Sequence, residues 1–173
     1  MKILALETSA KSVSAAVVEN GAVLASAYQN IGLTHSVTLM PLIDSMLKNA
    51  GLTARDMGLI AVAAGPGSFT GLRIGVSAAK GLAWALEFPC CGVSTLEAMA
   101  ENARSFEGTV ICAMDARRQQ IYNAVFDCHD GALTRQCEDR AVALEVLAEE
   151  LKNSNNRKIV VGDGAKQCYT YLS

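Results

Sequence analysis

The chain has 173 residues, of which 51% are hydrophobic and 18% are charged. So many apolar residues, with a charged fraction below the roughly 25% of average domains, exclude a disordered or fibrous chain and fit one domain or two small lobes. Fifteen Lys and Arg against seventeen Asp and Glu give a net charge of −2 without a basic run. This balance argues against binding of duplex nucleic acid by the chain alone and against a polybasic membrane anchor.

Neither export nor membrane insertion is expected. The N-terminal apolar run ends at Glu7 after four residues, and the uncharged apolar stretch Met57–Leu72 is too short and too glycine-rich to span a membrane. The six cysteines include no C-x-x-C pair, and Cys90, Cys91 and Cys112 lie in apolar runs. We therefore predict a cytoplasmic protein whose cysteines are reduced and buried as small hydrophobic residues.

The first third of the chain has the sequence patterns of three strands followed by one helix. Lys2–Thr8, Val13–Glu19 and Ala22–Gln29 are predicted strands, and Asn20-Gly21 supplies the residues of a tight hairpin turn. Apolar residues at helical spacing predict an amphipathic helix over His35–Lys48. The opening is thus three strands followed by a helix.

A glycine-rich loop comes next. Leu59–Ala64 is a predicted buried strand, Gly65–Gly71 the loop, and Leu72–Leu86 a helix. Cys90–Val93 and Ser94–Ala103 repeat strand and helix, and this last helix opens with the S-x-x-E pattern of a capping box. The loop therefore stands between a strand and a helix N-terminus.

The second half of the chain repeats this order. Strands are predicted at 109–115, 121–127 and 132–137, a helix at 141–151, and a strand with a glycine loop at 159–164. Each half has an acid at the end of its first strand, Glu7 or Asp115, and a turn glycine farther on, Gly21 or Gly131. We therefore predict two copies of one β-β-β-α-β-α unit, residues 1–104 and 105–173, the second ending inside its last expected helix.

Glycine loops before helices expose backbone N–H groups, which is the physical basis of phosphate binding. The loops here match no catalytic motif, because no Lys follows the second glycine as in a P-loop, and Ser68 lacks the flanking glycines of a nucleophile elbow. A tight turn with close helix packing is the alternative. His35 and His129, the only histidines, have no metal-ligand spacing, so no metal site is predicted.

Three motifs carry a resemblance to a known family. They are LALETSAKSVS at 4–14, GPGSFTGLRIG at 65–75 with AKGLA at 79–83, and MDARR at 114–118. In these motifs, and in their order along the whole chain, the sequence resembles the TsaB family, also called YeaZ. The GPGSFTGLR loop is the most specific of the three.

This resemblance implies the α/β ASKHA fold, the two-lobed architecture of actin, sugar kinases and Hsp70. It also implies a non-catalytic scaffold subunit for threonylcarbamoyl transfer to N6 of adenosine 37 in tRNA, which is t6A biosynthesis. The implied partners are a TsaD-like catalytic subunit and a TsaE-like ATPase. A homodimer is implied for the isolated chain, with tRNA reached only through the complex.

In active ASKHA ATPases a glycine-rich turn follows the acid of each first strand, whereas no glycine follows Glu7 or Asp115 directly here. We therefore expect degenerate nucleotide loops, no catalytic residue and no tightly bound cofactor. Binding of ATP or ADP at the interface with a partner is left open. The degenerate positions are Glu7, Thr8, Ser9, Gly65, Gly67, Ser68, Thr70, Gly71, Asp115, Gly162 and Gly164. The alternative function is an ASKHA ATPase or small-molecule phosphotransferase that acts alone.

The resemblance further implies that the first-lobe helices contact the partner or a second copy, a role that suits methionine and large aromatic side chains. The candidate positions are His35, Met40, Ile43, Leu47, Arg73, Ile74, Lys80 and Trp84. Arg117 and Arg118 are candidates for a contact with a phosphate or a partner carboxylate. The alternative for the apolar residues is packing in the core of their own lobe, and for the arginines it is plain solvation.

Overall fold

The computed structural model describes residues 1–32, 34–152 and 156–172. The chain forms two compact α/β units that divide between Val93 and Ser94. The predicted boundary after residue 104 is therefore too late. The reason is that helix α3 (Thr95–Glu101) packs against strands β6 and β7 of the second unit.

The first unit contains a five-stranded sheet in the order β3-β2-β1-β4-β5. Its strands are β1 (Lys2–Glu7), β2 (Val13–Glu19), β3 (Ala22–Gln29), β4 (Leu59–Gly65) and β5 (Cys90–Ser94). Strand β1 lies at the centre, antiparallel to β2 and parallel to β4. The carboxyl ends of β1 and β4 therefore meet at one edge of the sheet, where the glycine loop follows β4.

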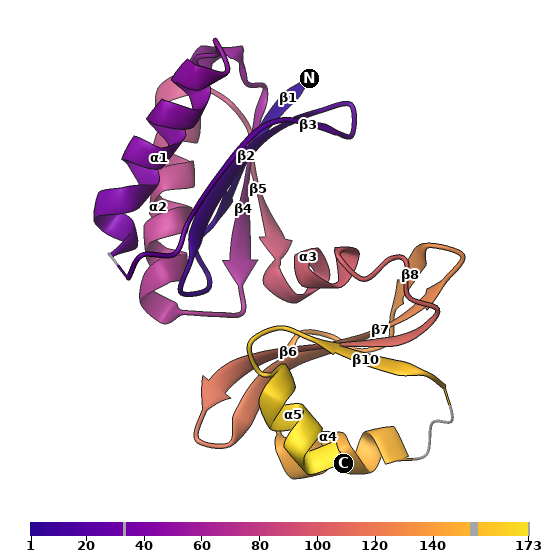
Figure 1. The fold of residues 1–173 in the computed structure, drawn as a ribbon. Helices are drawn as coiled ribbons and strands as arrows, with labels where there is room; N and C mark the ends of the chain where they lie inside the picture. The colour runs from indigo at the N-terminus through magenta and orange to yellow at the C-terminus, as the bar shows by residue number, and fades with distance from the viewer. Residues whose placement is uncertain (33, 153–155, 173) are drawn as a thin grey trace. The chain divides into compact units, whose positions relative to one another are not determined.

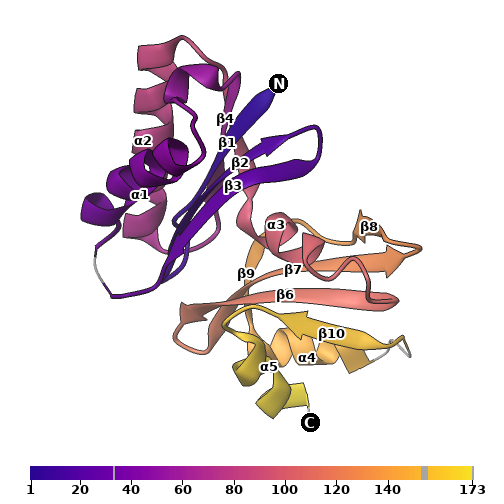
Figure 2. The same ribbon diagram turned by 45° about the horizontal axis from the view of Figure 1, so that its top comes forward.

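Helices α1 (His35–Asn49) and α2 (Phe69–Leu86) lie together on one face of this sheet (Figures 1 and 2). A short 3-10 helix, Ala54–Asp56, precedes β4. The core lies between helices and sheet because α1 turns an apolar stripe inward at three- and four-residue spacing. The buried residues of that stripe include Leu39, Leu42, Ile43, Met46 and Leu47.

The second unit contains strands in the order β10-β6-β7-β8, and β9 also pairs with β7. The strands are β6 (Gly108–Arg117), β7 (Gln120–His129), β8 (Ala132–Arg135), β9 (Arg140–Ala143) and β10 (Lys158–Val161). Helices α4 (Leu144–Lys152) and α5 (Ala165–Leu172) pack against each other, and α5 contacts β6 and β10. A second core, which includes Ile111, Ile121 and Leu147, lies between these elements.

Apart from the additional strand β9 in the second, the two units repeat one topology, as predicted. Each has an antiparallel meander whose first strand pairs in parallel with the strand after the helix. Each also has a two-residue turn between its second and third strands. Asn20 and Gly21 have φ values of 50° and 79°, and Asp130 and Gly131 have 49° and 73°. These left-handed pairs match the twist of a hairpin, which explains why the glycines recur.

Two predictions on local structure are wrong. Arg140–Ala143 forms β9 and not the start of a helix, because this segment pairs with the outer edge of β7. Cys90 and Cys91 are exposed, because β5 is the outermost strand of its sheet. Cys112 is buried as predicted, and burial raises the pKa of its thiol to about 12. All six cysteines are free thiols.

Among the described residues, no helix combines the length and the hydropathy that a membrane span requires.

Candidate functional site

The glycine loop of the first unit packs directly onto the turn that follows β1. The N–H of Ser68 donates to the carbonyl oxygen of Ser9 over 2.6 Å, and the hydroxyl of Thr8 donates to the carbonyl oxygen of Gly71 over 2.8 Å. Within the turn, the N–H of Ser9 donates to the Glu7 carboxylate. The end of β1 and the start of α2 are therefore joined by hydrogen bonds between their own groups.

Three glycines permit this close approach, since each faces an atom that a side chain would strike. A Cβ on Gly71 would lie 2.0 Å from the carbonyl oxygen of Thr8, and one on Gly75 would lie 2.2 Å from the Thr8 hydroxyl. A Cβ on Gly67 would lie 2.6 Å from the carbonyl oxygen of Ser9. These glycines serve tight packing, which is one of the two roles that the sequence left open.

The N-terminus of α2 is capped from within the chain. The Ser68 hydroxyl accepts the N–H of Gly71 over 3.2 Å, and the Ser68 carbonyl accepts the N–H of Leu72 over 2.8 Å. Helix α2 begins at Phe69, before the predicted Leu72, because Ser68 supplies this cap. Ser9 is only 2% exposed, and its hydroxyl has no hydrogen-bond partner among the described residues. An anion at this helix start would have to displace the Ser9 carbonyl from the N–H of Ser68.

The loop of the second unit is closed in a comparable way. The N–H of Gly164 donates to the carbonyl oxygen of Ala113 over 3.1 Å, and a Cβ on Gly162 would lie 2.1 Å from the same oxygen. The N–H of Asp115 donates to the carboxylate of Asp163 over 3.0 Å. Sequence reasoning missed Asp163, although it stands between the two loop glycines. Its carboxylate occupies the N–H of Asp115, which is therefore not free to bind another acceptor.

A groove of about 490 Å³ runs between α1 and α2. It is lined by His35, Ser36, Leu39, Met40, Phe69, Thr70, Arg73, Ile74, Ser77 and Ala78. The His35 ring donates from Nε2 to the carbonyl oxygen of Ala10 over 2.9 Å. The Arg73 guanidinium lies 3.7 Å from the centre of the Phe69 ring, in cation–π contact. Met40 and Phe69 are 44% and 68% exposed, so the groove presents apolar side chains to solvent.

The structure divides the predicted partner residues into three groups. His35, Met40, Arg73 and Ile74 line the groove. Lys80 and Trp84 are exposed on α2 beyond the residues of the groove, with Trp84 88% exposed. Ile43 and Leu47 are not on this surface, because they are only 3% and 5% exposed and belong to the core beneath α1. Sequence reasoning also missed Phe69, which it assigned to the loop.

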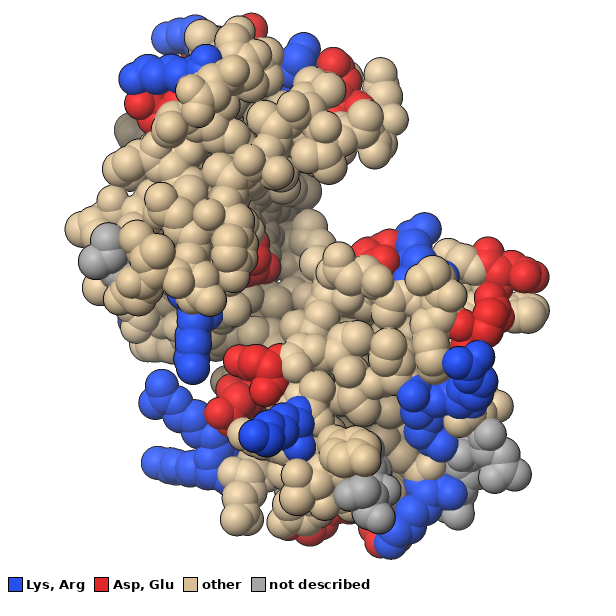
Figure 3. Space-filling view, viewed as in Figure 1, with Lys and Arg blue, Asp and Glu red and all other residues tan. Residues whose placement is uncertain are grey.

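The charged side chains of the first unit lie mainly at the two ends of the visible face, with an uncharged surface between them (Figure 3).

Arg117 is the last residue of β6, and Arg118 follows it in the turn to β7. Both are exposed, and both have left-handed backbone conformations, with φ values of 67° and 52°. The N–H of Arg117 donates to the Asp115 carboxylate over 2.7 Å, which orients the turn. Their side chains are open to a ligand or a partner.

One group of side chains among the described residues comes close enough to hold a cation. The ligand atoms of Glu107, His129 and Asp130 lie within 4.8 Å of one another, and all three residues are exposed. Sequence spacing did not reveal the group because Glu107 precedes His129 by a full hairpin. The carboxylate of Glu107 already accepts hydrogen bonds from the His129 ring and from the N–H of Asp130. These hydrogen bonds explain why the three side chains lie together. We call the contact between Glu107 and His129, which joins the start of β6 to the end of β7, the clamp.

The duplicated β-β-β-α-β-α units, each with a glycine loop after the parallel strand, define the ASKHA class of folds. A likeness of fold extends to the ethanolamine utilization protein EutJ of Carboxydothermus hydrogenoformans, 13% identical with a TM-score of 0.50 over 98% of this chain and 78% of that one. A family model described as "TsaD: tRNA N6-adenosine threonylcarbamoyltransferase" matches residues 29–163.

Relatives of higher identity name the family within that class. The chain is 38% identical to the tRNA threonylcarbamoyladenosine biosynthesis protein TsaB of Bacillus subtilis, over 94% of this chain and 71% of the relative. It is 34% identical to TsaB of Escherichia coli, over 95% and 72%. The structure of YeaZ from Pseudomonas aeruginosa is 32% identical with a TM-score of 0.74, over 82% of this chain and 67% of that one. The chain belongs to the TsaB (YeaZ) family.

Proposed function

We propose that this chain is a non-catalytic subunit for the formation of threonylcarbamoyladenosine in tRNA, acting with a TsaD-like catalytic subunit. Relatives of the chain are named for this biosynthesis, and a family model named for the threonylcarbamoyltransferase matches most of its length. In this proposal a TsaE-like ATPase joins the complex. The chain reaches tRNA only as part of that complex. The net charge of −2 is consistent with a chain that does not bind tRNA tightly alone.

The observation that carries the non-catalytic role is the closure of both glycine loops. A phosphate site requires backbone N–H groups that point at the ligand. Here the N–H of Ser68 is bonded to the carbonyl oxygen of Ser9, and the N–H of Gly164 is bonded to the carbonyl oxygen of Ala113. The proposal therefore includes no tightly bound nucleotide in either loop. ATP or ADP at the interface with the catalytic subunit is compatible with it.

The groove between α1 and α2 is the surface that we propose for the catalytic subunit. Exposed apolar side chains at the centre of a contact, beside an arginine, are typical of binding hot spots. Met40, Phe69 and Arg73 have this arrangement. Trp84 extends the same exposed apolar character along α2.

Calorimetric titration of the chain with the catalytic subunit of the same organism tests this surface. We expect Phe69→Ala to weaken binding at least tenfold, because it removes an aromatic anchor and the contact that orders Arg73, and to lower t6A formation in parallel. Val146→Ala is the matched control, since Val146 is 49% exposed but lies on α4 of the second unit. Equal binding by both variants would contradict the proposed surface.

An ATPase assay on the chain alone tests the non-catalytic role. We expect no turnover above that of a buffer blank, and no change with Asp115→Ala. Turnover by the isolated chain that is abolished by Asp115→Ala would instead establish the ATPase or phosphotransferase alternative.

A further inference from the structure

The turn between β6 and β7 differs from two other hairpin turns of the chain in its residue types. The turns between β2 and β3 and between β7 and β8 place Asn20-Gly21 and Asp130-Gly131 in the left-handed region, which these residue types adopt readily. The turn between β6 and β7 places Arg118 and Gln119 there, with φ values of 52° and 60°. Arg117, the last residue of β6, has a φ of 67°, so three non-glycine residues in a row are left-handed.

This backbone conformation is strained, and the surrounding structure holds it in place. A left-handed backbone brings Cβ close to the following carbonyl oxygen, which costs free energy at every residue other than glycine. The Asp115 carboxylate accepts the N–H of Arg117 over 2.7 Å, and the carbonyl oxygen of Gln119 accepts the N–H of Leu144, the first residue of α4, over 3.4 Å. Strained backbone of this kind clusters at functional sites. The turn, at one end of the sheet of the second unit (Figures 1 and 2), is therefore a candidate site.

The two arginines at this turn present their charge to solvent. Both are exposed, and the structure describes no ion pair or ring contact for either guanidinium. The other arginines of the second unit have such partners. Carboxylates pair with Arg104, Arg135 and Arg140, and Arg157 lies 5.2 Å from the centre of the Phe106 ring. Two unpaired guanidinium groups on a rigid backbone are pre-organised for anionic groups.

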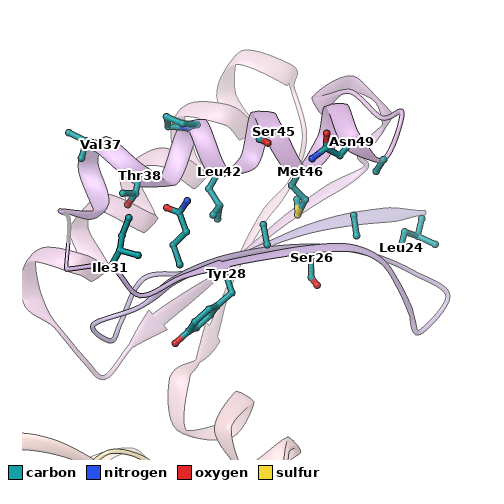
Figure 4. Close-up of a pocket in the computed structure, with 15 residues that line it drawn as sticks. Leu24, Ser26, Tyr28, Ile31, Val37, Thr38, Leu42, Ser45, Met46 and Asn49 are labelled. Carbon is teal, nitrogen blue, oxygen red and sulfur yellow. The ribbon is translucent and has the colours of Figure 1, made fainter.

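The turn lacks the apolar anchors that are typical of a contact with a protein. None of the exposed large apolar side chains among the described residues comes from residues 115–121. The grooves with apolar linings belong to the first unit. One runs between α1 and α2, and one of about 700 Å³ runs between α1 and β3, toward which Leu42 and Met46 point (Figure 4). Interfaces with nucleic acids, in contrast, are polar and positively charged. The exposed Gln119 and Gln120 beside the arginines fit such an interface.

We propose that Arg117 and Arg118 bind backbone phosphates of tRNA when the chain is assembled with its catalytic subunit. The planar guanidinium groups donate to phosphate oxygens, for which their geometry is suited. Such contacts position a nucleic acid without reading its sequence. Two of them are few against a net charge of −2, so the contact acts within the complex and not in the isolated chain. The inference therefore rests on the proposed function.

Binding of a tRNA transcript that carries adenosine 37 to the assembled complex, measured by fluorescence anisotropy at several salt concentrations, tests the contact. We expect Arg117→Ala and Arg118→Ala each to weaken binding about three- to tenfold and to lower the slope of log affinity against log salt by roughly one. Arg55→Ala is the matched control, because Arg55 is exposed but lies in the 3-10 helix of the first unit. Size-exclusion chromatography establishes that each variant assembles with the catalytic subunit.

A double variant separates the strain of the turn from its charge. Arg118→Asn with Gln119→Gly gives this turn the residue types of the hairpin between β2 and β3. We expect the midpoint of thermal unfolding to rise by roughly 2–4 °C, because these residues adopt the left-handed region with less strain. The affinity for tRNA should nevertheless fall as it does in Arg118→Ala.

Several results would overturn the inference. Unchanged tRNA affinity and salt slope in both alanine variants would do so and would leave the proposed function intact. Weaker assembly with the catalytic subunit, with normal tRNA affinity of the complex that forms, would assign the arginines to a carboxylate of that subunit instead. A double variant that keeps full tRNA affinity would show that the charge of Arg118 is not used. Failure of the unmodified chain to assemble with the catalytic subunit would contradict the proposed function, and the inference with it.

Discussion

At the scale of single residues, the glycines of α2 illustrate how one residue type serves opposite purposes. Gly71 and Gly75 face the turn after β1, where no side chain fits. Gly81 lies on the exposed side of the same helix, and a Cβ there would meet nothing within 4 Å. The same substitution at these positions therefore has opposite expected effects on stability.

Gly71→Ala should destabilise the chain by about 2–3 kcal/mol, because the new Cβ would have to push the Thr8 carbonyl from its place. Gly81→Ala should stabilise it by roughly 0.5–1 kcal/mol, since alanine loses less backbone entropy in a helix. Urea unfolding of both variants checks this pair. A small or favourable effect of Gly71→Ala would show that the loop contact is not tight.

The clamp between Glu107 and His129 predicts a pH dependence of stability. The hydrogen bond to Glu107 raises the pKa of His129 above its ordinary value of 6.5, with further help from Asp130. The same bond lowers the pKa of Glu107 below its ordinary 4.5. The His129 contribution is present below pH 6.5 and is lost as the pH rises through its raised pKa. The Glu107 contribution is present above pH 4.5 and is lost as the pH falls through its lowered pKa.

Both contributions therefore coexist between about pH 4.5 and 6.5. Thermal unfolding of the unmodified chain and of His129→Gln should differ slightly at about pH 5.5, and the difference should shrink at about pH 8.5. Both groups are exposed to solvent, so the effect is small and should weaken further in high salt. An equal difference at both pH values would argue against the clamp.

At the scale of elements, a polar network assigns α3 to the second unit. The hydroxyl of Ser94, the N-cap of α3, accepts the N–H of Glu97 and donates to Asp139 over 2.5 Å. Arg135 bonds both the Asp139 and the Glu97 carboxylates and lies over the Phe126 ring. The predicted capping box is thus half formed, because the described hydrogen bond of the Glu97 carboxylate goes to Arg135.

Ser94→Ala should cost about 1–2 kcal/mol, since it removes the cap and leaves the Asp139 carboxylate short of one donor. Ser36→Ala is a matched control, because the hydrogen bond that the structure describes for the Ser36 hydroxyl is an exposed 3.3 Å contact with the Thr34 hydroxyl. Chemical unfolding compares the two variants. Similar effects of both substitutions would contradict the role of this network.

At the scale of the whole molecule, each unit has its own hydrophobic core. Leu4 and Leu39 are buried in the first, and Ile121 and Leu147 in the second. Contacts within a core, more than hydrogen bonds at a surface, set the free energy of local opening. The two units should therefore respond separately to core substitutions.

Leu39→Ala and Leu147→Ala should each cost about 2–5 kcal/mol in the unit that carries the cavity. Hydrogen exchange followed by mass spectrometry should show faster exchange in the strands around that cavity, with little change in the other unit. Equal acceleration in both units by either variant would mean that they unfold as one cooperative body.

The sequence by itself determined the features that rest on local physics. Helical spacing identified α1, left-handed turn residues identified both hairpins, and the repeated order of elements identified the duplication. The class of fold came from the resemblance of three motifs to a known family. Only the tertiary structure decided which groups those elements bring together. It showed that Ile43 faces the core while Met40 faces the groove, that Arg140–Ala143 pairs with β7, and that Asp163 bonds to the N–H of Asp115. These outcomes depend on segments far apart in the chain, whose contacts no local pattern encodes.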